Sequence, residues 1–268
     1  PLMTTTASDI CVAVAAERPL EPMRPVRRAW VDQIMGLPIS VHVRAADTTR
    51  EDIAVGVRRV FDHLRLVDRV FSTWRADSDL LRLQHGEAQV DAVHPWLAEV
   101  TDLCLEAEGV TDGLFSAWRC QAGGRRVFDP TGLVKGWGVA GAAAHLEVLD
   151  EIQWCIGAGG DLLAGTGRGM VDMAPTWRVG IEDPRDRRRI ADVITLSRNA
   201  VATSGSAARG AHIHDPSSGA PIDRVGSTTV IGPDLMWADV WATAAFVNPA
   251  RAGLLIADRA PDYSLLTL

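Results

Sequence analysis

An apolar segment close to the C-terminal end, residues 235–247, constrains the fold more than any other part of the sequence. Its mostly apolar side chains are typical of a helix packed inside a protein. Asp239 and Thr243 interrupt this pattern, and their offset of four residues places both oxygens on one helix face. A buried carboxylate is costly unless its charge is compensated. The sequence therefore predicts a packed helix that carries one polar spot.

Two interpretations of this polar spot are open. A hard divalent cation such as Mg²⁺ would compensate the carboxylate, because it takes oxygen ligands and leaves positions for waters and phosphates. Alternatively, Asp239 lies on an exposed stripe and Thr243 bonds back to its own helix.

Composition excludes several classes of protein. The chain has 268 residues, of which 47% are hydrophobic and 23% charged, as in ordinary globular proteins. The formal net charge of −7 argues against a nucleic-acid binder and against an anionic membrane surface as partner. The 4 cysteines lack CxxC spacing, so neither a zinc site nor a disulfide framework is indicated.

Helices and strands are expected to be interspersed without regular βαβ alternation, which favours a single mixed α+β domain. Residues 1–28 lack periodicity and are predicted to form a loosely ordered arm, followed by one domain over residues 29–268. Helices are expected at residues 52–71, 95–109, 134–149, 235–247 and 250–259. Strands are expected at residues 39–43, 153–156, 177–181, 190–196, 200–203, 228–231 and 263–268.

The N-terminal region lacks the basic and apolar regions of a signal peptide. No stretch of about 18 apolar residues occurs, so membrane insertion is not expected. A cytoplasmic protein is the simplest prediction.

A glycine-containing turn at residues 128–136 feeds the third expected helix. The backbone N–H groups at such a helix entry suit a phosphate, and Lys135 would add a positive charge there. The spacing of a P-loop is absent. The alternative is an ordinary helix entry with a solvated lysine.

Two further segments combine glycines or histidines with polar groups. Residues 157–165 resemble a dinucleotide fingerprint, but the glycines stand at the wrong offsets. His212 and His214 precede Asp215-Pro216-Ser217-Ser218-Gly219, which is also strong turn chemistry. A structural role for these histidines is therefore open beside a ligand-binding one.

Taken together and in order, these segments resemble the FAD:protein FMN transferases, the ApbE family. The resemblance covers about residues 30–250. The matching blocks are Met35-Gly36, residues 71–80, Thr111-Asp112-Gly113-Leu114-Phe115, residues 129–136, Gly159-Gly160-Asp161, residues 177–184, Thr203-Ser204-Gly205, residues 212–219 and residues 238–243.

The resemblance implies an enzyme that binds Mg²⁺ and FAD, cleaves the pyrophosphate, and moves FMN onto a Thr or Ser hydroxyl of an acceptor flavoprotein, with release of AMP. Asp239 and Thr243 would bind the metal with the backbone carbonyl of Gly132, and His212 would lie near the phosphates. The FAD contacts implied are Met35, Trp74, Leu114, Phe115, Ser116, Asp129, Lys135 and His214.

Three positions depart from the family pattern. Ser116 and Ala140 stand where the family usually has Asp, and Gln84 stands where it usually has Asn. The first departure would weaken an FAD contact, and the second would remove a carboxylate near the site.

Two other functions remain open beside transfer. A related enzyme could hydrolyse FAD to FMN and AMP, although aromatic Trp74 resembles the transferase type. A non-catalytic FAD-binding protein is the second alternative, and the retained pair of Asp239 and Thr243 argues against it.

Overall fold

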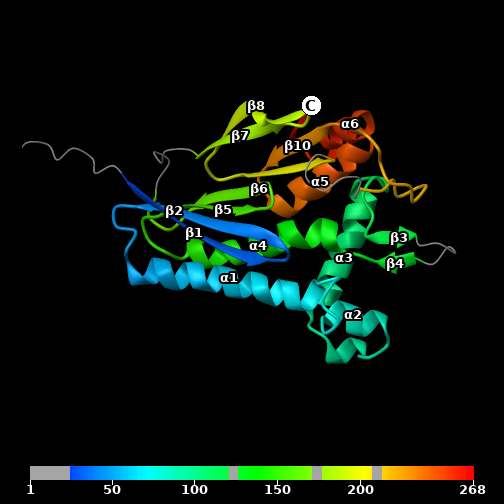
Figure 1. Ribbon diagram of the computed structural model, residues 1–268, viewed down its shortest axis with the longest axis horizontal. Coiled ribbons are helices and arrows are strands. Elements are labelled where there is room, and N and C mark those ends of the chain that lie inside the picture. Colours follow the sequence, from blue (N-terminus) through cyan, green and yellow to red (C-terminus); the bar gives the residue numbers. More distant parts are fainter. Residues whose placement is uncertain (1–24, 121–125, 171–176, 207–212) are drawn as a thin grey trace, which may run out of the picture.

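A seven-stranded sheet forms the centre of the computed structural model, which describes residues 25–120, 126–170, 177–206 and 213–268 (Figure 1). The strand order is β1-β2-β5-β6-β9-β10-β11, and the pairs are antiparallel. These strands are β1 (Val26–Ile34), β2 (Leu37–Ala45), β5 (Gln153–Ala158), β6 (Asp161–Thr166), β9 (Ala200–Gly205), β10 (Ser227–Gly232) and β11 (Ser264–Thr267). The α+β class predicted from the sequence is confirmed.

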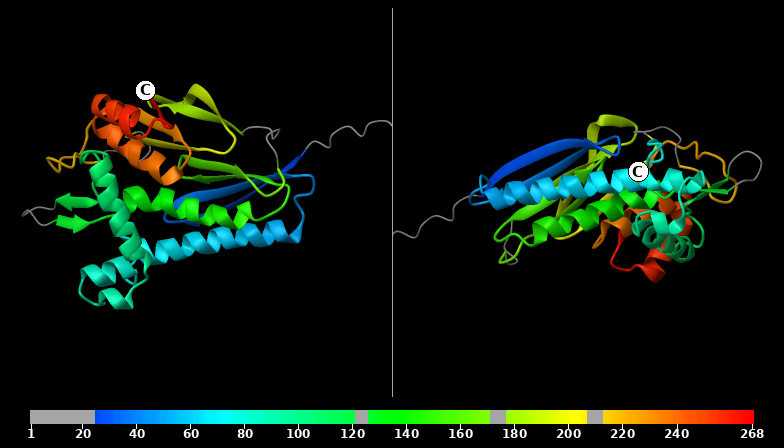
Figure 2. Two further views of the ribbon diagram at one scale, coloured as in Figure 1. Left: turned by 180° about the vertical axis from the view of Figure 1, so that it is seen from behind. Right: turned by 90° about the horizontal axis from the view of Figure 1, so that it is seen from below.

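Helices cover one face of this sheet (Figures 1 and 2). The long ones are α1 (Glu51–Phe71), α3 (Trp96–Val110), α4 (Thr131–Glu147), α5 (Leu235–Val247) and α6 (Pro249–Arg259). Helix α4 packs between α1 and the sheet, and α5 packs on α4, β9 and β10. Shorter elements are α2 (Asp79–Gln84), the 3-10 turn Val90–Ala92, and the small sheet of β3 (Trp118–Cys120) and β4 (Arg126–Phe128).

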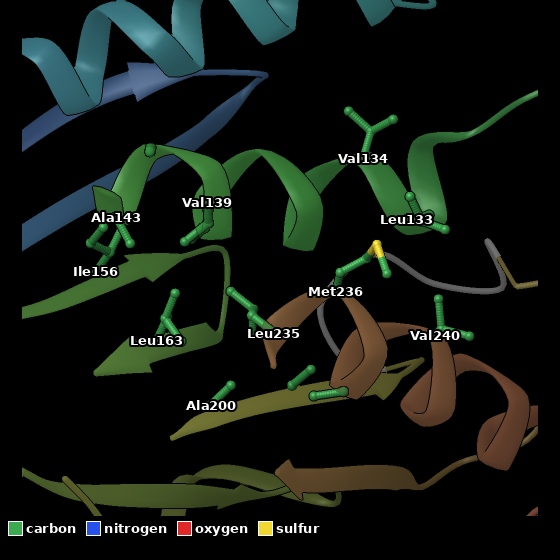
Figure 3. Close-up of a cluster of buried hydrophobic side chains, with 14 of the residues drawn as sticks. Leu133, Val134, Val139, Ala143, Ile156, Leu163, Ala200, Leu235, Met236 and Val240 are labelled. Atoms are coloured by element: carbon green, nitrogen blue, oxygen red, sulfur yellow. The ribbon is translucent and has the colours of Figure 1, made fainter. Parts of the chain in front are cut away.

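The main core lies between these helices and the sheet. Figure 3 shows side chains of α4 and α5 meeting those of β5, β6 and β9. Helix α1 contributes a buried stripe at helical spacing, as its sequence predicted. Helix α5 is buried on nearly all sides and has the predicted bounds.

A hairpin of β7 (Trp177–Asp183) and β8 (Asp186–Leu196) lies against the other face of the sheet (Figure 1). It encloses a second, smaller core that includes Cys155, Trp177, Leu196 and Val201. The middle of the sheet is therefore buried on both faces, by helices on one side and by a hairpin on the other.

The structure corrects several sequence-based assignments. Strand β1 begins at Val26, so the last residues assigned to the N-terminal arm belong to the sheet. Strands β3, β4 and β6 and helix α2 lie in segments where no element was predicted. Among the described helices, none has both the length and the apolar character that crossing a bilayer requires.

Candidate active site

A cavity of about 1400 Å³ opens at one end of the sheet. Its walls come from the β5–β6 turn, the start of α4, helix α5, strand β9 and the β7–β8 hairpin. Pockets for drug-sized ligands are usually about 300–1,000 Å³. The space therefore suits a ligand of dinucleotide size.

Three charged side chains meet in the wall of this cavity. The Lys135 ammonium forms an ion pair with Asp161, and its Nζ lies 3.1 Å from Oδ2 of Asp239. The two acids are almost fully buried, with 1% and 6% of their side chains exposed, whereas 17% of Lys135 is exposed. Two buried carboxylates need compensating positive charge, and the Lys135 ammonium lies close enough to both to supply it.

Close packing of two helices brings this cluster together. Gly136 follows Lys135 on α4, and a Cβ at Gly136 would lie 2.8 Å from the Leu235 carbonyl oxygen and 2.8 Å from the Met236 Cα. Only glycine therefore allows α4 to approach the start of α5 this closely. The approach places Lys135 beside Asp239, one turn into α5.

Hydroxyl groups of strand β9 and helix α5 lie next to the acids. The Ser204 and Thr243 hydroxyl oxygens are 3.2 Å apart, and both residues line the cavity. The backbone N–H of Thr203 donates to Oδ1 of Asp161 over 3.0 Å. The Thr203-Ser204-Gly205 block thus links the buried acid on β6 to the polar face of α5.

Most of the site residues expected from the sequence line this one cavity. They are Leu114, Phe115, Ser116, Asp129, Gly132, Lys135, His214, Asp239 and Thr243. Asp239 is buried rather than on an exposed stripe, which corrects the plainer of the two interpretations of that helix. Lys135 is also paired with acids rather than solvated, which corrects the plainer interpretation of the helix entry.

Two expected residues are absent from the described lining of the cavity, and one is not described. Met35 occupies the β1–β2 turn with φ of 55° and packs on the main core. Trp74 is 95% exposed, although its neighbour Thr73 lines the cavity. His212 lies outside the residues that the structure describes. The roles expected for these three residues stay predictions.

The segment that carries Leu114 and Phe115 is fixed by the end of α3. The buried Thr111 hydroxyl donates to the Ala107 carbonyl over 2.7 Å and accepts from the Phe115 N–H over 3.1 Å. The next residue, Asp112, pairs with Arg251 and Arg259 of α6. These bonds hold two apolar side chains at the cavity wall.

Asp129 is held in place from two sides. Arg119 Nε lies 2.8 Å from its Oδ2, while Oδ1 accepts from both the N–H and the hydroxyl of Thr131 at the start of α4. Ser116, one of the departures from the family pattern, accepts from the Trp118 N–H over 3.2 Å. Both polar groups therefore have a local structural role beside any contact to a ligand.

The other two departures differ in position. Gln84 lines the cavity, and its side-chain amide donates to the Phe128 carbonyl over 2.6 Å. Ala140 packs against the main core on α4 and is not part of the described lining. The expected effect of Ala140, the loss of a carboxylate near the site, stays a prediction.

Oxygen donors for a metal are present in the cluster. The Asp239 carboxylate and the Thr243 hydroxyl project from one face of α5, as their spacing predicted, and Ser204 adds a second hydroxyl. Within the described ranges, no group of three or more His, Cys, Asp or Glu residues could hold a metal ion. The donor set is hard and mixed, which suits Mg²⁺ better than zinc.

Asp161 and Ser204 are site residues to which sequence reasoning gave no role. Asp161 follows two glycines and begins strand β6, so a polar residue at a sharp turn was the available signal. Ser204 stands in a short polar run on β9. Neither signal identifies a partner, because the partners are distant in sequence.

The chain also matches a family model and curated relatives. A family model described as the ApbE family matches residues 35–118 and 117–266. The FAD:protein FMN transferase of Klebsiella pneumoniae (strain 342) is 26% identical over 255 residues, which cover 72% of this chain and 71% of that protein. The FAD:protein FMN transferase of Haemophilus influenzae is 31% identical over 142 residues, 49% of this chain and 40% of that protein.

Solved structures show the same fold. The ApbE protein of Thermotoga maritima matches with a TM-score of 0.73 and 20% identity, covering 90% of this chain and 94% of its own. Flavin transferase ApbE from Vibrio cholerae matches with a TM-score of 0.70 and 22% identity, covering 91% and 93%. At these identities the likeness supports the fold alone.

Proposed function

The chain belongs to the ApbE family, and from this premise we propose that it is an enzyme that transfers FMN from FAD to an acceptor flavoprotein. The acceptor group is a Thr or Ser hydroxyl, and the leaving group is AMP. The observation that carries the proposal is the buried cluster of Lys135, Asp161 and Asp239 in the wall of a cavity of dinucleotide size.

FAD would lie with its pyrophosphate at this charged end. Lys135 stands in the second turn of α4, where its positive charge and the N–H groups of the helix start favour phosphate oxygens. Leu114 and Phe115 offer apolar surface, and Asp129 and His214 offer polar contacts. Met35, Trp74 and Ser116 complete the proposed set, and the exposed Trp74 ring would stack on the flavin.

Mg²⁺ is the metal that we propose for this site. Asp239 and Thr243 would hold it together with the Gly132 carbonyl, because all three are hard oxygen donors at the cavity wall. When bound, the ion would neutralise charge that develops on the phosphate oxygens during in-line transfer.

The protein's own groups would position the reaction. Lys135 can exchange its carboxylate partners for a phosphate oxygen and so hold the phosphate in line with the entering hydroxyl. His212, which the resemblance places near the phosphates, is the residue we propose to assist proton transfer. Trp74, stacked on the bound flavin, would shield the pyrophosphate from bulk water and thereby favour a protein hydroxyl as acceptor.

The test is to supply FAD, Mg²⁺ and candidate flavoproteins from the same cell. Flavin fluorescence retained on a denaturing gel, with the mass gain of one FMN on a single Thr or Ser, supports transfer. Release of AMP and free FMN that no acceptor diminishes would instead identify a hydrolase.

A binding-only protein makes a different prediction. It would retain FAD unchanged during incubation with Mg²⁺ and every acceptor, and chromatography would recover neither AMP nor FMN. The expected cytoplasmic location stays a prediction that fractionation of the source cells can test.

A further inference from the structure

One row of residues runs across four strands at the end of the cavity that lies under the hairpin. Val31, Ser40, Gly157 and Leu162 are direct cross-strand partners on β1, β2, β5 and β6, and all four line the cavity. We call these four residues the Ser40 row. Ser40 carries the only polar side chain within it, so the row combines apolar surface with one hydroxyl.

A chain of hydrogen bonds orients this hydroxyl. The Arg27 Nη2 lies 3.1 Å from Nδ1 of His42, and Nε2 of His42 lies 3.2 Å from Oγ of Ser40. A guanidinium can only donate, so Nδ1 must accept and the imidazole proton must be on Nε2. His42 therefore donates to Ser40, and the Ser40 proton is left for another acceptor.

The surroundings of His42 favour the neutral imidazole over the protonated one. Burial and the positive charges of Arg27 and Arg44 lower the pKa of His42. The Trp177 ring lies 6.2 Å from the imidazole, and the Arg44 guanidinium stacks on that ring at 3.8 Å. Cys155, the cross-strand partner of His42, is a buried thiol whose pKa is raised to about 12 by desolvation, so it is uncharged at neutral pH.

Gly157 leaves the space that the hydroxyl needs. A Cβ at Gly157 would lie 2.7 Å from Oγ of Ser40, closer than real Cβ contacts. Among hydrogen bonds between described residues, none uses the Ser40 hydroxyl as donor. The proton that His42 leaves unused can therefore be given to a molecule in the cavity.

We propose that Ser40 is a specificity-determining hydrogen-bond donor to a planar nitrogen heterocycle of the bound nucleotide, with His42 and Arg27 as its positioning residues. The apolar neighbours offer contact to a flat ring, since Val31 is 65% exposed beside Ser40 and Leu162 is half-buried on the far side of Gly157. A phosphate is better accommodated at the other end of the cavity, where Lys135 and the N–H groups at the start of α4 lie together. The identity of the ligand as FAD rests on the proposed function.

Both ends of FAD carry a planar heterocycle with acceptor atoms on its edge, so the test uses each half separately. Dissociation constants for FAD, FMN and AMP are measured by titration calorimetry on the full chain without Mg²⁺. Ser40→Ala is expected to weaken FAD binding about 3- to 10-fold, the usual value of one hydrogen bond. The same loss for FMN but not AMP assigns the flavin to the row, and the reverse assigns the adenine.

The positioning role is tested by a matched pair at the histidine. His42→Gln keeps an acceptor for Arg27 and a donor for Ser40, so FAD binding should stay within about twofold of wild type. His42→Leu removes both the acceptor and the donor and should weaken FAD binding as much as Ser40→Ala does. The double variant Ser40→Ala/His42→Leu should lose no more FAD affinity than either single variant. Ser264→Ala, at an exposed position on β11, is the control and should bind FAD as wild type does.

The outcomes separate this proposal from the proposed function. Normal FAD binding by Ser40→Ala, or additive losses in the double variant, would overturn the role of Ser40 or of His42 while leaving the enzyme assignment intact. A wild-type protein that binds no FAD would overturn both. In the transfer assay, Ser40→Ala should raise KM for FAD and leave kcat within about twofold, whereas a general loss of structure would lower kcat as well.

Discussion

On one face of the seven-stranded sheet, helices α1, α4 and α5 bury a continuous core that reaches from β2 to β10. On the other face, a two-stranded hairpin covers a handful of side chains around Trp177 and Leu196. Stability rises with the apolar area removed from water, so the larger core on the helical face contributes most of the stability. The hairpin face buries less apolar area and forms part of the cavity wall.

The charged cluster lies in the cavity at one end of the sheet, which is lined by residues from both faces. Lys135 and Asp239 are presented by helices of the large core, which fixes their positions. Ser40 and His42 project from the hairpin face, where polar and apolar groups are mixed. In the two proposals, the helical face positions the reacting groups and the hairpin face selects the ligand.

The largest expected effect breaks the helical face. Leu146→Ala removes a fully buried side chain of α4 and should lower the free energy of unfolding by about 4 kcal/mol, because the cavity between α1 and α4 cannot collapse. Urea denaturation followed by circular dichroism measures it. Leu254→Ala, at a 75% exposed position on α6, is the matched control and should change little. A loss below about 1 kcal/mol for Leu146→Ala would contradict the assignment of stability to this face.

The next effect concerns activity at the charged cluster. Asp239→Asn should lower the rate of FMN transfer about 10²- to 10³-fold, or about 3 to 4 kcal/mol, because the proposed metal site would lose one hard anionic ligand. The fold should keep its stability within about 1 kcal/mol, since Lys135 retains Asp161 as partner. Initial rates against Mg²⁺ concentration check the first part. Asp258→Asn, at an exposed position on α6, is the control. Equal rates for both variants would show that transfer does not depend on Asp239.

A smaller loss of stability is expected on the hairpin face. Leu196→Ala empties a fully buried position opposite Trp177, yet the hairpin can settle toward the sheet, so the expected loss is about 2 kcal/mol. The same variant should weaken FAD binding, because the hairpin forms part of the cavity wall, whereas Leu146→Ala should not. The two faces would be equivalent if both variants lost equal stability and neither changed the affinity for FAD.

The smallest effect is a dependence on pH. The pKa of His42 is lowered from its ordinary value of 6.5, first by burial and then by Arg27 and Arg44. Trp177 and the uncharged Cys155 also face the ring. FAD affinity should stay constant as pH falls to 6.5 and decline severalfold below the lowered pKa, since protonated Nδ1 no longer accepts from Arg27.

His42→Gln provides the control for this profile, because its amide does not titrate. The difference between the two proteins isolates the histidine from other groups. The free energy of unfolding depends on pH in the same direction. The pKa of His42 is lower in the folded state than its ordinary value of 6.5, so folding favours the neutral imidazole. The contribution of His42 to stability is therefore complete above pH 6.5 and is lost as the pH falls. Identical profiles for the two proteins would refute a role for His42 in this range.

Helices were predictable from the sequence because each encodes its own pattern of burial. Residues 52–71 repeat apolar side chains at helical spacing, and 235–247 are apolar nearly throughout, and both became helices within one residue of the expected bounds. Strands β1 and β6 were missed for opposite reasons. Strand β1 lies at the edge of the sheet with most side chains exposed, whereas β6 is buried on both faces and begins with an acid, so neither alternates clearly.

The sequence by itself determined which side chains share a helix face, such as Asp239 and Thr243, and the order of blocks that marks the family. Those features depend on local geometry. Only the tertiary structure decided that Lys135 lies between Asp161 and Asp239, and that His42 hydrogen-bonds to both Arg27 and Ser40. Such partners come from different elements, and their contact depends on how closely those elements pack, which local spacing does not specify.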